Sequence, residues 1–333
     1  MLQNKKAIIL YILKILEKYS DANHPLTQVK ISDLIRQEYC VDVERKTIGY
    51  YLQVLLDFDY DIRKVEKKGF YLGERIFDPS EVTFLTDAIY SSKIIESHQA
   101  KQLSEKIYST LSKYDQRHYD SLYKTSDISR ANNKEFFCNI EVINEAIAKK
   151  KKVKFQYINF DEKGNEVFRN GGFAPRVSPY FLVNNYGRYY LVANYYKSNG
   201  TTNYRIDLMK NVVICENENA RDFRELTDLP KNFSISDYVN DHIYMFGGKV
   251  ITSEIEIDDV KHIVYIKDWF GNRAKFYKVN DKLYARVKVD EDALVYWALQ
   301  YIQYFKIVKP IELQEKIKEL LKNGLDKYEN KNT

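Results

Sequence analysis

The sequence predicts an α+β protein with several domains, and three observations along the chain predict it. Two amphipathic helical patterns, a short basic helical pattern and two strand-like runs fill the first 76 residues. After Lys150 the apolar period changes from about 3.6 to about 2. The last third has the order strand, helix, strand, strand, helix, strand. We therefore predict domains at residues 1–76, 77–134, 135–230 and 231–333.

Two helices are predicted before residue 40. The first has apolar residues at helical spacing, namely Ile8, Ile12, Ile15 and Leu16. Thr27 is a suitable N-cap for the second, because its hydroxyl can accept a hydrogen bond from a first-turn N–H group. The second helix carries Ile31, Leu34 and Ile35 on one face. The segment Tyr39–Val43 is the predicted turn to a third helix.

The third predicted helix is basic at its start and apolar on one side. Arg45, Lys46 and Thr47 fall in its first turn, where donors can reach DNA phosphates or base edges. The residues expected to pack inward are Ile48, Leu52, Leu55 and Leu56. Tyr50 is expected either at a DNA phosphate or sugar or in the core, and Tyr51 either toward the hairpin or in the core.

A short hairpin is predicted at Tyr60–Leu72, after the basic helix. Lys67 and Lys68 form its tip, and Gly69 relieves backbone strain there. Helix, turn, basic helix and basic hairpin together indicate a winged helix-turn-helix that binds double-stranded DNA. The alternative is a small three-helix bundle whose Lys67 and Lys68 only face solvent.

Helical spacing returns between Glu81 and Ser112 and predicts connecting helices. A polar linker is expected at residues 127–134. Another helix is expected at Phe137–Lys149, followed by five short strands that suggest a small β-barrel. The predicted strands are Val153–Ile158, Phe173–Val183, Arg188–Tyr196, Thr202–Leu208 and Val212–Ile214. Residues 221–248 show no regular pattern.

The last third is predicted to form a ferredoxin-like domain with one added helix. Its expected strands are Val250–Ile257, Ala274–Val279, Leu283–Val289 and Phe305–Val308. Its expected helices are Val260–Trp269, Asp292–Tyr304 and Ile311–Leu321.

Composition and motifs argue against several classes of protein. The formal charge of +5 permits a polyanionic partner without requiring one, although basic residues outnumber acidic ones between residues 140 and 214. The 29 tyrosines suit base stacking, or they reflect an AT-rich genome. The three cysteines are far apart, which predicts neither a zinc site nor disulfides and fits the cytoplasm. No apolar run is long enough to span a membrane.

Catalytic and cofactor-binding motifs are not apparent. The five histidines have unrelated spacings, and the sequence has no phosphate-binding loop or nucleophile elbow. Asp57, Asp59 and Asp61 could together hold a metal, but a solvated turn explains them better. We expect a protein that is not an enzyme and has no metal or cofactor.

The middle of the chain resembles the WYL domain, which is named for a Trp-Tyr-Leu triplet. The triplet stands here as Tyr189, Tyr190 and Leu191, so the Trp position departs from the family. Similar segments flank it at Ala174–Tyr180 and Tyr204–Met209. With the preceding and following domains, the chain resembles bacterial WYL-domain transcription regulators over nearly its whole length.

The resemblance implies an Sm-like barrel, a homodimer, and sensing of an effector, which in this family is often a nucleic acid or nucleotide. The effector contacts that it implies are Arg176, Tyr180, Arg188, Tyr190 and Arg205. Tyr190 could equally be a core ring. An ion pair of Arg205 with Asp207 is disfavoured, because residues two apart on a strand need not meet.

These observations predict a homodimeric transcription regulator whose affinity for an operator is tuned by an effector. The alternative is a sensor that binds single-stranded nucleic acid or RNA, in which the helix-turn-helix only dimerises. Relatives often carry Arg-Asp where this chain has Tyr50 and Tyr51, so the operator sequence cannot be transferred. The dimer interface is expected in the connecting helices or the C-terminal domain.

Overall fold

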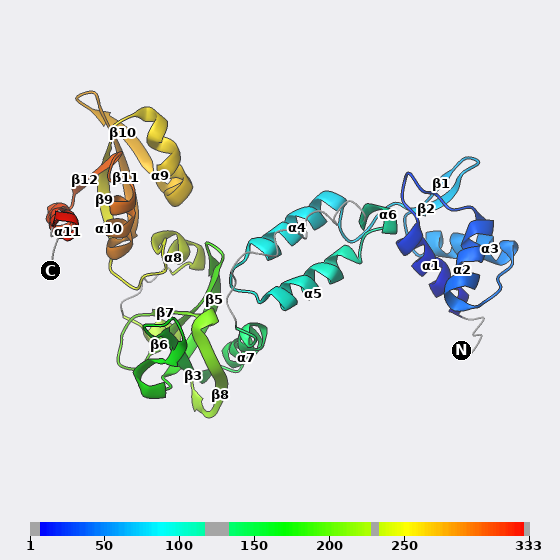
Figure 1. The fold of residues 1–333 in the computed structure, drawn as a ribbon, viewed down its shortest axis with the longest axis horizontal. Helices are drawn as coiled ribbons and strands as arrows, with labels where there is room; N and C mark the ends of the chain where they lie inside the picture. The colour runs from blue at the N-terminus through cyan, green and yellow to red at the C-terminus, as the bar shows by residue number, and fades with distance from the viewer. Residues whose placement is uncertain (1–6, 117–132, 228–232, 330–333) are drawn as a thin grey trace. The chain divides into compact units, whose positions relative to one another are not determined.

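A computed structural model describes residues 7–116, 133–227 and 233–329. Its internal contacts divide the chain into two compact units, Met1–Asn132 and Asn133–Thr333 (Figure 1). The first unit contains helices and one hairpin, and the second contains two β-sheets with their helices. The α+β class is therefore confirmed. None of the helices in these ranges has an apolar stretch long enough to cross a bilayer.

Three helices open the first unit, as the sequence predicts. They are α1 (Ile8–Tyr19), α2 (Gln28–Tyr39) and α3 (Arg45–Asp57). Thr27 caps α2, because its side chain accepts a hydrogen bond from the N–H of Lys30. The apolar faces of the three helices share one core, which includes Ile12, Ile31, Ile35, Ile48 and Leu52. The prediction that Leu56 packs inward is wrong: its side chain is 40% exposed, because it lies one position beyond the buried stripe that ends at Leu55.

A two-stranded antiparallel hairpin follows, with β1 (Ile62–Val65) and β2 (Gly69–Leu72). Gly69 has φ of +123°, a conformation that favours glycine, so its predicted role is confirmed. The hairpin is extended by Leu26, which exchanges backbone hydrogen bonds of 2.7 and 2.8 Å with Phe70. A side chain on Gly69 would collide with the Leu26 carbonyl. The sequence did not indicate this third segment.

The connecting helices of the first unit are α4 (Pro79–Ser91), α5 (Ser97–Tyr108) and α6 (Lys113–Gln116). Arg75 connects them to the end of α1: its guanidinium donates to the carbonyls of Glu17 (2.8 Å), Ser20 (2.6 Å) and Thr110 (3.3 Å). Burial lowers the pKa of Arg75. Most of the linker predicted at residues 127–134 lies outside the described residues.

The second unit begins with α7 (Phe136–Ala148), which packs against a curled sheet. The strands are β3 (Lys151–Phe160), β4 (Glu166–Phe168), β5 (Arg176–Asn185), β6 (Arg188–Tyr195), β7 (Thr202–Arg205) and β8 (Met209–Asn219). The sheet order is β4-β3-β5-β6-β7. Strand β8 lies outside this order and also pairs with β3. The sequence anticipated these strands except β4, a short exposed one after a turn.

The C-terminal part has a second, four-stranded antiparallel sheet. Its elements are β9 (Val250–Ile257), α9 (Ile263–Phe270), β10 (Lys275–Val279), β11 (Lys282–Asp290), α10 (Glu291–Gln300), β12 (Phe305–Lys309) and α11 (Ile311–Glu329). The strand order is β10-β11-β9-β12. Phe270 of α9 and Trp297 of α10 lie in one core with Ile255 and Ile257 of β9. Because alternate strand residues share a face, both helices cover the same face of the sheet.

Helix α8 (Ile235–Asp241) lies in the segment for which the sequence predicted no regular structure. Ser234 caps it by accepting a hydrogen bond of 3.3 Å from the N–H of Asp237. Its side chains reach both sheets of the second unit. Tyr238 donates to Asn203 of β7, and Asp241 accepts from Lys288 of β11. The helix therefore connects the curled sheet with the C-terminal sheet.

Candidate functional site

The residues predicted to bind DNA lie on the exposed parts of α3 and the hairpin. Arg45 and Lys46 are exposed in the first turn of α3, and Thr47 is half-buried. Tyr50 is 66% exposed one turn further along the helix, with its ring edge-on to Tyr51 at 5.3 Å. A helix that buries one face and exposes donors in its first turn is suited to a DNA groove.

The hairpin carries the remaining predicted DNA contacts at its tip. Lys67 and Lys68 are exposed in the turn between β1 and β2, and Lys67 has φ of +61°. Two further cations, Arg63 and Lys64, are exposed on β1. Arg63 is paired with Asp61 at 2.7 Å, so Lys64 adds more to the unpaired positive charge of the hairpin.

One contact on this face was not expected from the sequence. The Nε of Arg45 donates a hydrogen bond of 2.9 Å to the Oε1 of Gln28, the first residue of α2. This bond restricts the rotamers of a long, exposed side chain. Gln28 is therefore a candidate positioning residue for Arg45. Seventeen residues separate the two, and no local pattern links them.

The structure brings two of the five predicted effector residues together, because Tyr190 and Arg205 are direct partners in the β6–β7 ladder, whereas Arg176 of β5 pairs with β3. Arg176 is exposed and forms an ion pair of 2.7 Å with Glu218. Arg188 is exposed at the start of β6, and no described acidic residue pairs with it. Tyr180 packs edge-on against Phe223 at 4.9 Å, and burial raises its pKa to about 12.

Tyr190 is a core residue, one of the two roles that the sequence left open. Its side chain is only 8% exposed and packs in a cluster with Val183, Val192, Tyr238 and Met245. A planar ring in this position stabilises the sheet by removing apolar surface from water. Direct stacking of a ligand on Tyr190 would require this cluster to open.

The expectation that Arg205 does not pair with Asp207 is wrong. The Nη2 and Nε of Arg205 lie 2.6 and 3.2 Å from the two carboxylate oxygens of Asp207. The reason is the short 3-10 turn Ile206–Leu208, which bends the chain directly after β7 and brings residues two apart together. The bond to Asp207 raises the pKa of Arg205. Asp207 is buried, so Arg205 is held as its structural partner.

A basic pocket of about 470 Å³ lies on the curled sheet. Its lining is polar and includes the predicted residue Arg176. The lining residues are Lys152, Arg176, Ser178, Asn194, Tyr196, Asn199, Asn219 and Arg221. They come from β3, β5, β6, the turn after β6 and the end of β8 with the residues after it, and most are far apart in the sequence. Of these lining residues, the sequence indicated Arg176 alone. The basic run at Lys149–Lys152 and the polar Asn194 inside an apolar strand were the available signals.

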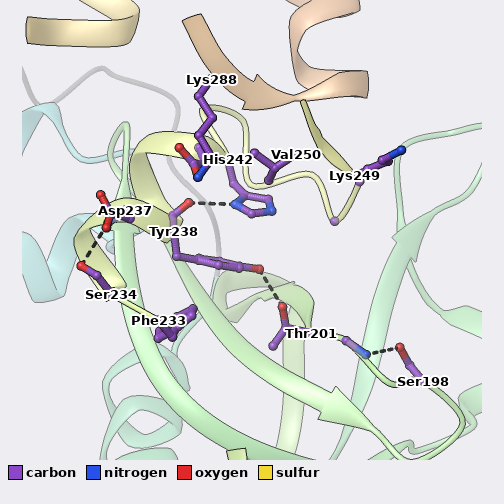
Figure 2. Close-up of a pocket in the computed structure, with 14 residues that line it drawn as sticks. Ser198, Thr201, Phe233, Ser234, Asp237, Tyr238, His242, Lys249, Val250 and Lys288 are labelled. Atoms are coloured by element: carbon purple, nitrogen blue, oxygen red, sulfur yellow. Dashed lines mark hydrogen bonds and ion pairs between the residues drawn. The ribbon is translucent and has the colours of Figure 1, made fainter. Parts of the chain in front are cut away.

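A larger pocket, of about 680 Å³, lies between the turn after β6, α8 and the strands β9 and β11, and we call it the α8 pocket (Figure 2). Its lining residues are Ser198, Gly200, Thr201, Phe233, Ser234, Asp237, Tyr238, Asp241, His242, Gly247, Gly248, Lys249, Val250 and Lys288. The hydroxyl of Tyr238 is 3.0 Å from that of Thr201. Figure 2 shows the two side chains pointing toward each other. The ring of Tyr238 stacks on His242 at 4.1 Å.

Three of the four charged residues that line the α8 pocket, Asp237, Asp241 and Lys288, take part in ion pairs. Asp241 is buried and accepts from Arg273 at 2.6 Å and from Lys288 at 2.7 Å. His242 directs its Nδ1 toward the carbonyl of Tyr238 at 2.8 Å. The pocket has the size of a small-molecule site, but its ion pairs connect α8 to β11 and select no particular ligand charge.

Neither pocket resembles a metal site. In the described ranges, no group of three or more His, Cys, Asp and Glu residues is arranged to hold a metal. The three aspartates considered above are not such a group, since Asp61 is paired with Arg63.

Comparison with known proteins identifies the curled sheet. Residues 139–214 match the family model of the WYL domain, which spans α7 to β8. The chain therefore contains a WYL domain at these residues, and the resemblance at the triplet is confirmed. No curated protein sequence matches the chain significantly.

Two solved structures are similar to the chain at 16% sequence identity. One is proteasome accessory factor B/C (PafBC) of Arthrobacter aurescens, with a TM-score of 0.30; the match covers 98% of this chain and 49% of that one. The chain thus spans about half the length of PafBC. The other is a CRISPR Cas-related protein, with a TM-score of 0.37 and coverage of 97% and 86%.

Proposed function

We propose that this WYL-domain protein is a transcription regulator that binds double-stranded operator DNA sequence-specifically. The observation that carries the proposal is the first turn of α3. Arg45 and Lys46 are exposed there, while Ile48 and Leu52 anchor the helix in the core. First-turn N–H groups of a helix have no intrahelical partner and also attract phosphate.

The proposed DNA contacts divide into two kinds. Arg45 reads a base, because a guanidinium can donate two bonds to the O6 and N7 of guanine in the major groove. Lys46, Lys67 and Lys68 neutralise phosphates, which fixes the register and makes binding sensitive to salt. Thr47 and Tyr50 hydrogen-bond or pack against the sugar-phosphate backbone. In this scheme residues 1–76 form a winged helix-turn-helix, and the hairpin is its wing.

Residues 135–230 form the proposed effector-sensing domain, and residues 77–134 and 231–333 are the connecting and C-terminal domains. The strands of the sensing domain support an Sm-like fold. The order β10-β11-β9-β12 with two helices on one face supports a ferredoxin-like C-terminal domain. The effector is a nucleic acid or nucleotide, since the basic pocket contains Lys152, Arg176 and Arg221.

We propose a cytoplasmic homodimer without catalytic activity. Two copies would place their α3 helices in successive major grooves, about 34 Å apart, on a palindromic operator. Exposed apolar side chains on α11 are available for association, and these are Leu320, Leu321, Leu325 and Tyr328. Effector binding tunes operator affinity only if the two dimer arrangements bind the effector differently.

Selection from a random duplex library tests this function. The full-length protein should enrich one motif with two-fold symmetry, and the Arg45→Ala/Lys46→Ala variant should enrich none. Absence of any enriched motif, with single strands bound equally by both proteins, would replace the proposal with the second candidate. That candidate is a single-stranded nucleic-acid or RNA sensor, which the cations of the basic pocket favour.

A further inference from the structure

Three cations lie side by side on neighbouring strands, and two of them, Lys152 and Arg176, line the basic pocket. Lys154 of β3 and Arg176 of β5 are direct partners in the antiparallel ladder. Lys152 is two residues from Lys154, so both point to the same face of β3. Like charges directly opposite each other destabilise a sheet. The arrangement therefore needs an anion to balance it.

Glu218 supplies that anion in the present structure. Its carboxylate lies 2.7 Å from the Nη1 of Arg176 and 3.2 Å from the Nζ of Lys152. Lys154 has no ion pair with any described residue, so positive charge remains. One carboxylate is thus shared by two cations with a third beside them.

The chain around Glu218 is a bulge in β8. Lys152 pairs with Cys215, whereas the preceding residue, Lys151, pairs with Asn219. Residues 216–218 are therefore left out of the ladder, and no strand pairing fixes their backbone. A bulge aims side chains away from the regular register and can move without breaking the neighbouring ladder. Glu218 is consequently held at the pocket by its two ion pairs.

Other lining residues offer hydrogen bonds and a stacking surface. Asn194 is 1% exposed and donates through its Nδ2 to the carbonyls of Ser198 and Gly200, at 2.8 and 2.7 Å. No donor among the described residues bonds to its buried Oδ1. Tyr196 is 64% exposed at the same pocket, so its ring is accessible to a planar group.

We propose that Glu218 is an internal substitute for phosphate, and that the basic pocket binds a phosphate group joined to an aromatic base by displacing it. Arg176 and Lys152 then form ion pairs with the phosphate oxygens in place of the Glu218 carboxylate. The base stacks on Tyr196, and a donor of the ligand bonds to Asn194. The ligand is either a free nucleotide or one unit of a single strand, since both contain this chemistry.

The exchange is favourable because a phosphate group has more acceptor oxygens than a carboxylate, and the phosphomonoester of a free nucleotide also has more charge. A guanidinium binds either group through two parallel hydrogen bonds, so the ion pairs that break at Glu218 are replaced by equivalent ones to the ligand. Lys154, which Glu218 leaves unpaired, adds a further attraction. Displacement would also free the bulge at residues 216–218, which gives the effector a direct structural effect on β8.

The test compares two carboxylates of the same bulge. Glu218→Gln removes the competing charge, whereas Glu216→Gln, the matched control, removes a charge that pairs with Lys149 outside the pocket lining. Binding of AMP, of a short oligothymidylate and of inorganic phosphate to the full-length protein is measured by calorimetry. We expect Glu218→Gln to bind AMP or the oligonucleotide about three- to tenfold more tightly, since it loses two partly exposed ion pairs.

The same titration also measures a variant that removes a cation of the pocket and should bind more weakly. Arg176→Ala should weaken binding by about tenfold or more, and Glu216→Gln should bind like the wild type. If AMP binds more tightly than the oligonucleotide, the ligand of the pocket is a free nucleotide. If the oligonucleotide binds more tightly than AMP, the ligand is a single strand. A larger increase in Tm with ligand for Glu218→Gln than for the wild type shows that the variant is folded.

Two results would overturn the inference. Equal affinities of Glu218→Gln, Glu216→Gln and the wild type would show that Glu218 does not compete, and unchanged binding by Arg176→Ala would place the ligand elsewhere. The inference deepens the proposed effector sensing and rests on it for its biological role. Operator binding is measured on the same preparations, so loss of operator recognition with intact ligand binding contradicts the proposed function alone.

Discussion

The hydroxyl of Tyr238 on α8 donates a hydrogen bond of 2.9 Å to the Oδ1 of Asn203 on β7. The amide of Asn203 in turn donates to the carbonyl of Met245 at 3.0 Å, in the segment that leads to β9. These bonds fix the segment after the WYL domain to one end of its curled sheet. Asp241, one turn along α8, makes the corresponding contact with Lys288 of the C-terminal sheet.

We predict that Tyr238→Phe lowers the free energy of unfolding of the second unit by about 1 kcal/mol. The change removes a donor from a buried contact and leaves the oxygen of Asn203 unpaired, while the ring remains in its cluster. Chemical denaturation of the full-length protein measures the effect. Tyr296→Phe, at a 62% exposed position of α10 in the same unit, is the control and should have no effect. Equal stabilities of the two variants would contradict the role of Tyr238.

Arg75→Ala should destabilise the first unit by roughly 2 kcal/mol. The carbonyls of Glu17 and Ser20 at the end of α1 would lose a charged donor, and the segment after α5 would lose its connection to α1 through Thr110. Hydrogen exchange should show faster exchange at the end of α1. Arg36→Ala removes an exposed pair with Asp42 and should change stability by less than about 1 kcal/mol. A similar small loss for Arg75→Ala would refute its bridging role.

Gly69→Ala should disrupt the hairpin far more than the same change in another turn. Its added Cβ would collide with the backbone of Leu26, so both strain and a lost β-bridge are expected. Gly164 also has positive φ, at +79°, but a Cβ there would meet no atom within 4 Å. Gly164→Ala should cost about 1 kcal/mol, and Gly69→Ala several times more. Thermal unfolding of both variants measures these losses of stability. Equal decreases in Tm would contradict the close packing of Gly69 against Leu26.

The stability of the C-terminal sheet should depend on the protonation of Asp290. Burial raises the pKa of this carboxyl above its usual value, although Asp290 also caps α10 by accepting from the N–H of Ala293 at 2.8 Å. Whenever this carboxyl is ionised the folded state contains a buried charge, whereas below the unfolded value of about 3.9 both folded and unfolded states are protonated. The charge penalty is full above the folded pKa and is lost as the pH falls through it toward the unfolded value.

Asp290→Asn keeps the capping oxygen and removes the charge, so it should be at least as stable as the wild type at pH 7. This advantage should shrink as the pH falls, because the wild type becomes neutral as well. Denaturation curves at several pH values provide the measurement. An advantage that grows toward acid would show that the pKa of Asp290 is lowered.

The sequence predicted regular elements well where apolar residues recur with one clear period. β9 has the predicted bounds Val250–Ile257, because alternation along a half-buried strand is unambiguous. Helix α11 continues to Glu329, beyond the predicted end at Leu321, since its last turns are mostly exposed and show little apolar periodicity. Helix α8 was missed because seven residues are too few for a period, and Tyr238 stabilises it through contacts distant in sequence.

Functional residues were predictable where one local segment contains them. The basic first turn of α3 is visible in the sequence, whereas its bond from Arg45 to Gln28 depends on how α2 packs. The basic pocket depends on strand register, which places Lys152 and Arg176 on one face beside Asn194. No sequence motif predicts which residues of the two strands are paired. The pairing of Arg205 with Asp207 was missed because the 3-10 turn after β7 was unknown.

The central claim is that the first turn of α3 reads DNA sequence. Fluorescence anisotropy at two salt concentrations measures binding of the wild type and of Arg45→Ala/Lys46→Ala to duplex from the gene's own upstream region and to random duplex. The wild type should prefer the upstream duplex, and the variant should lose this preference together with part of the salt dependence, about one counterion-release unit for each lost phosphate contact. Equal binding of both duplexes by the wild type, unchanged in the variant, would contradict the claim.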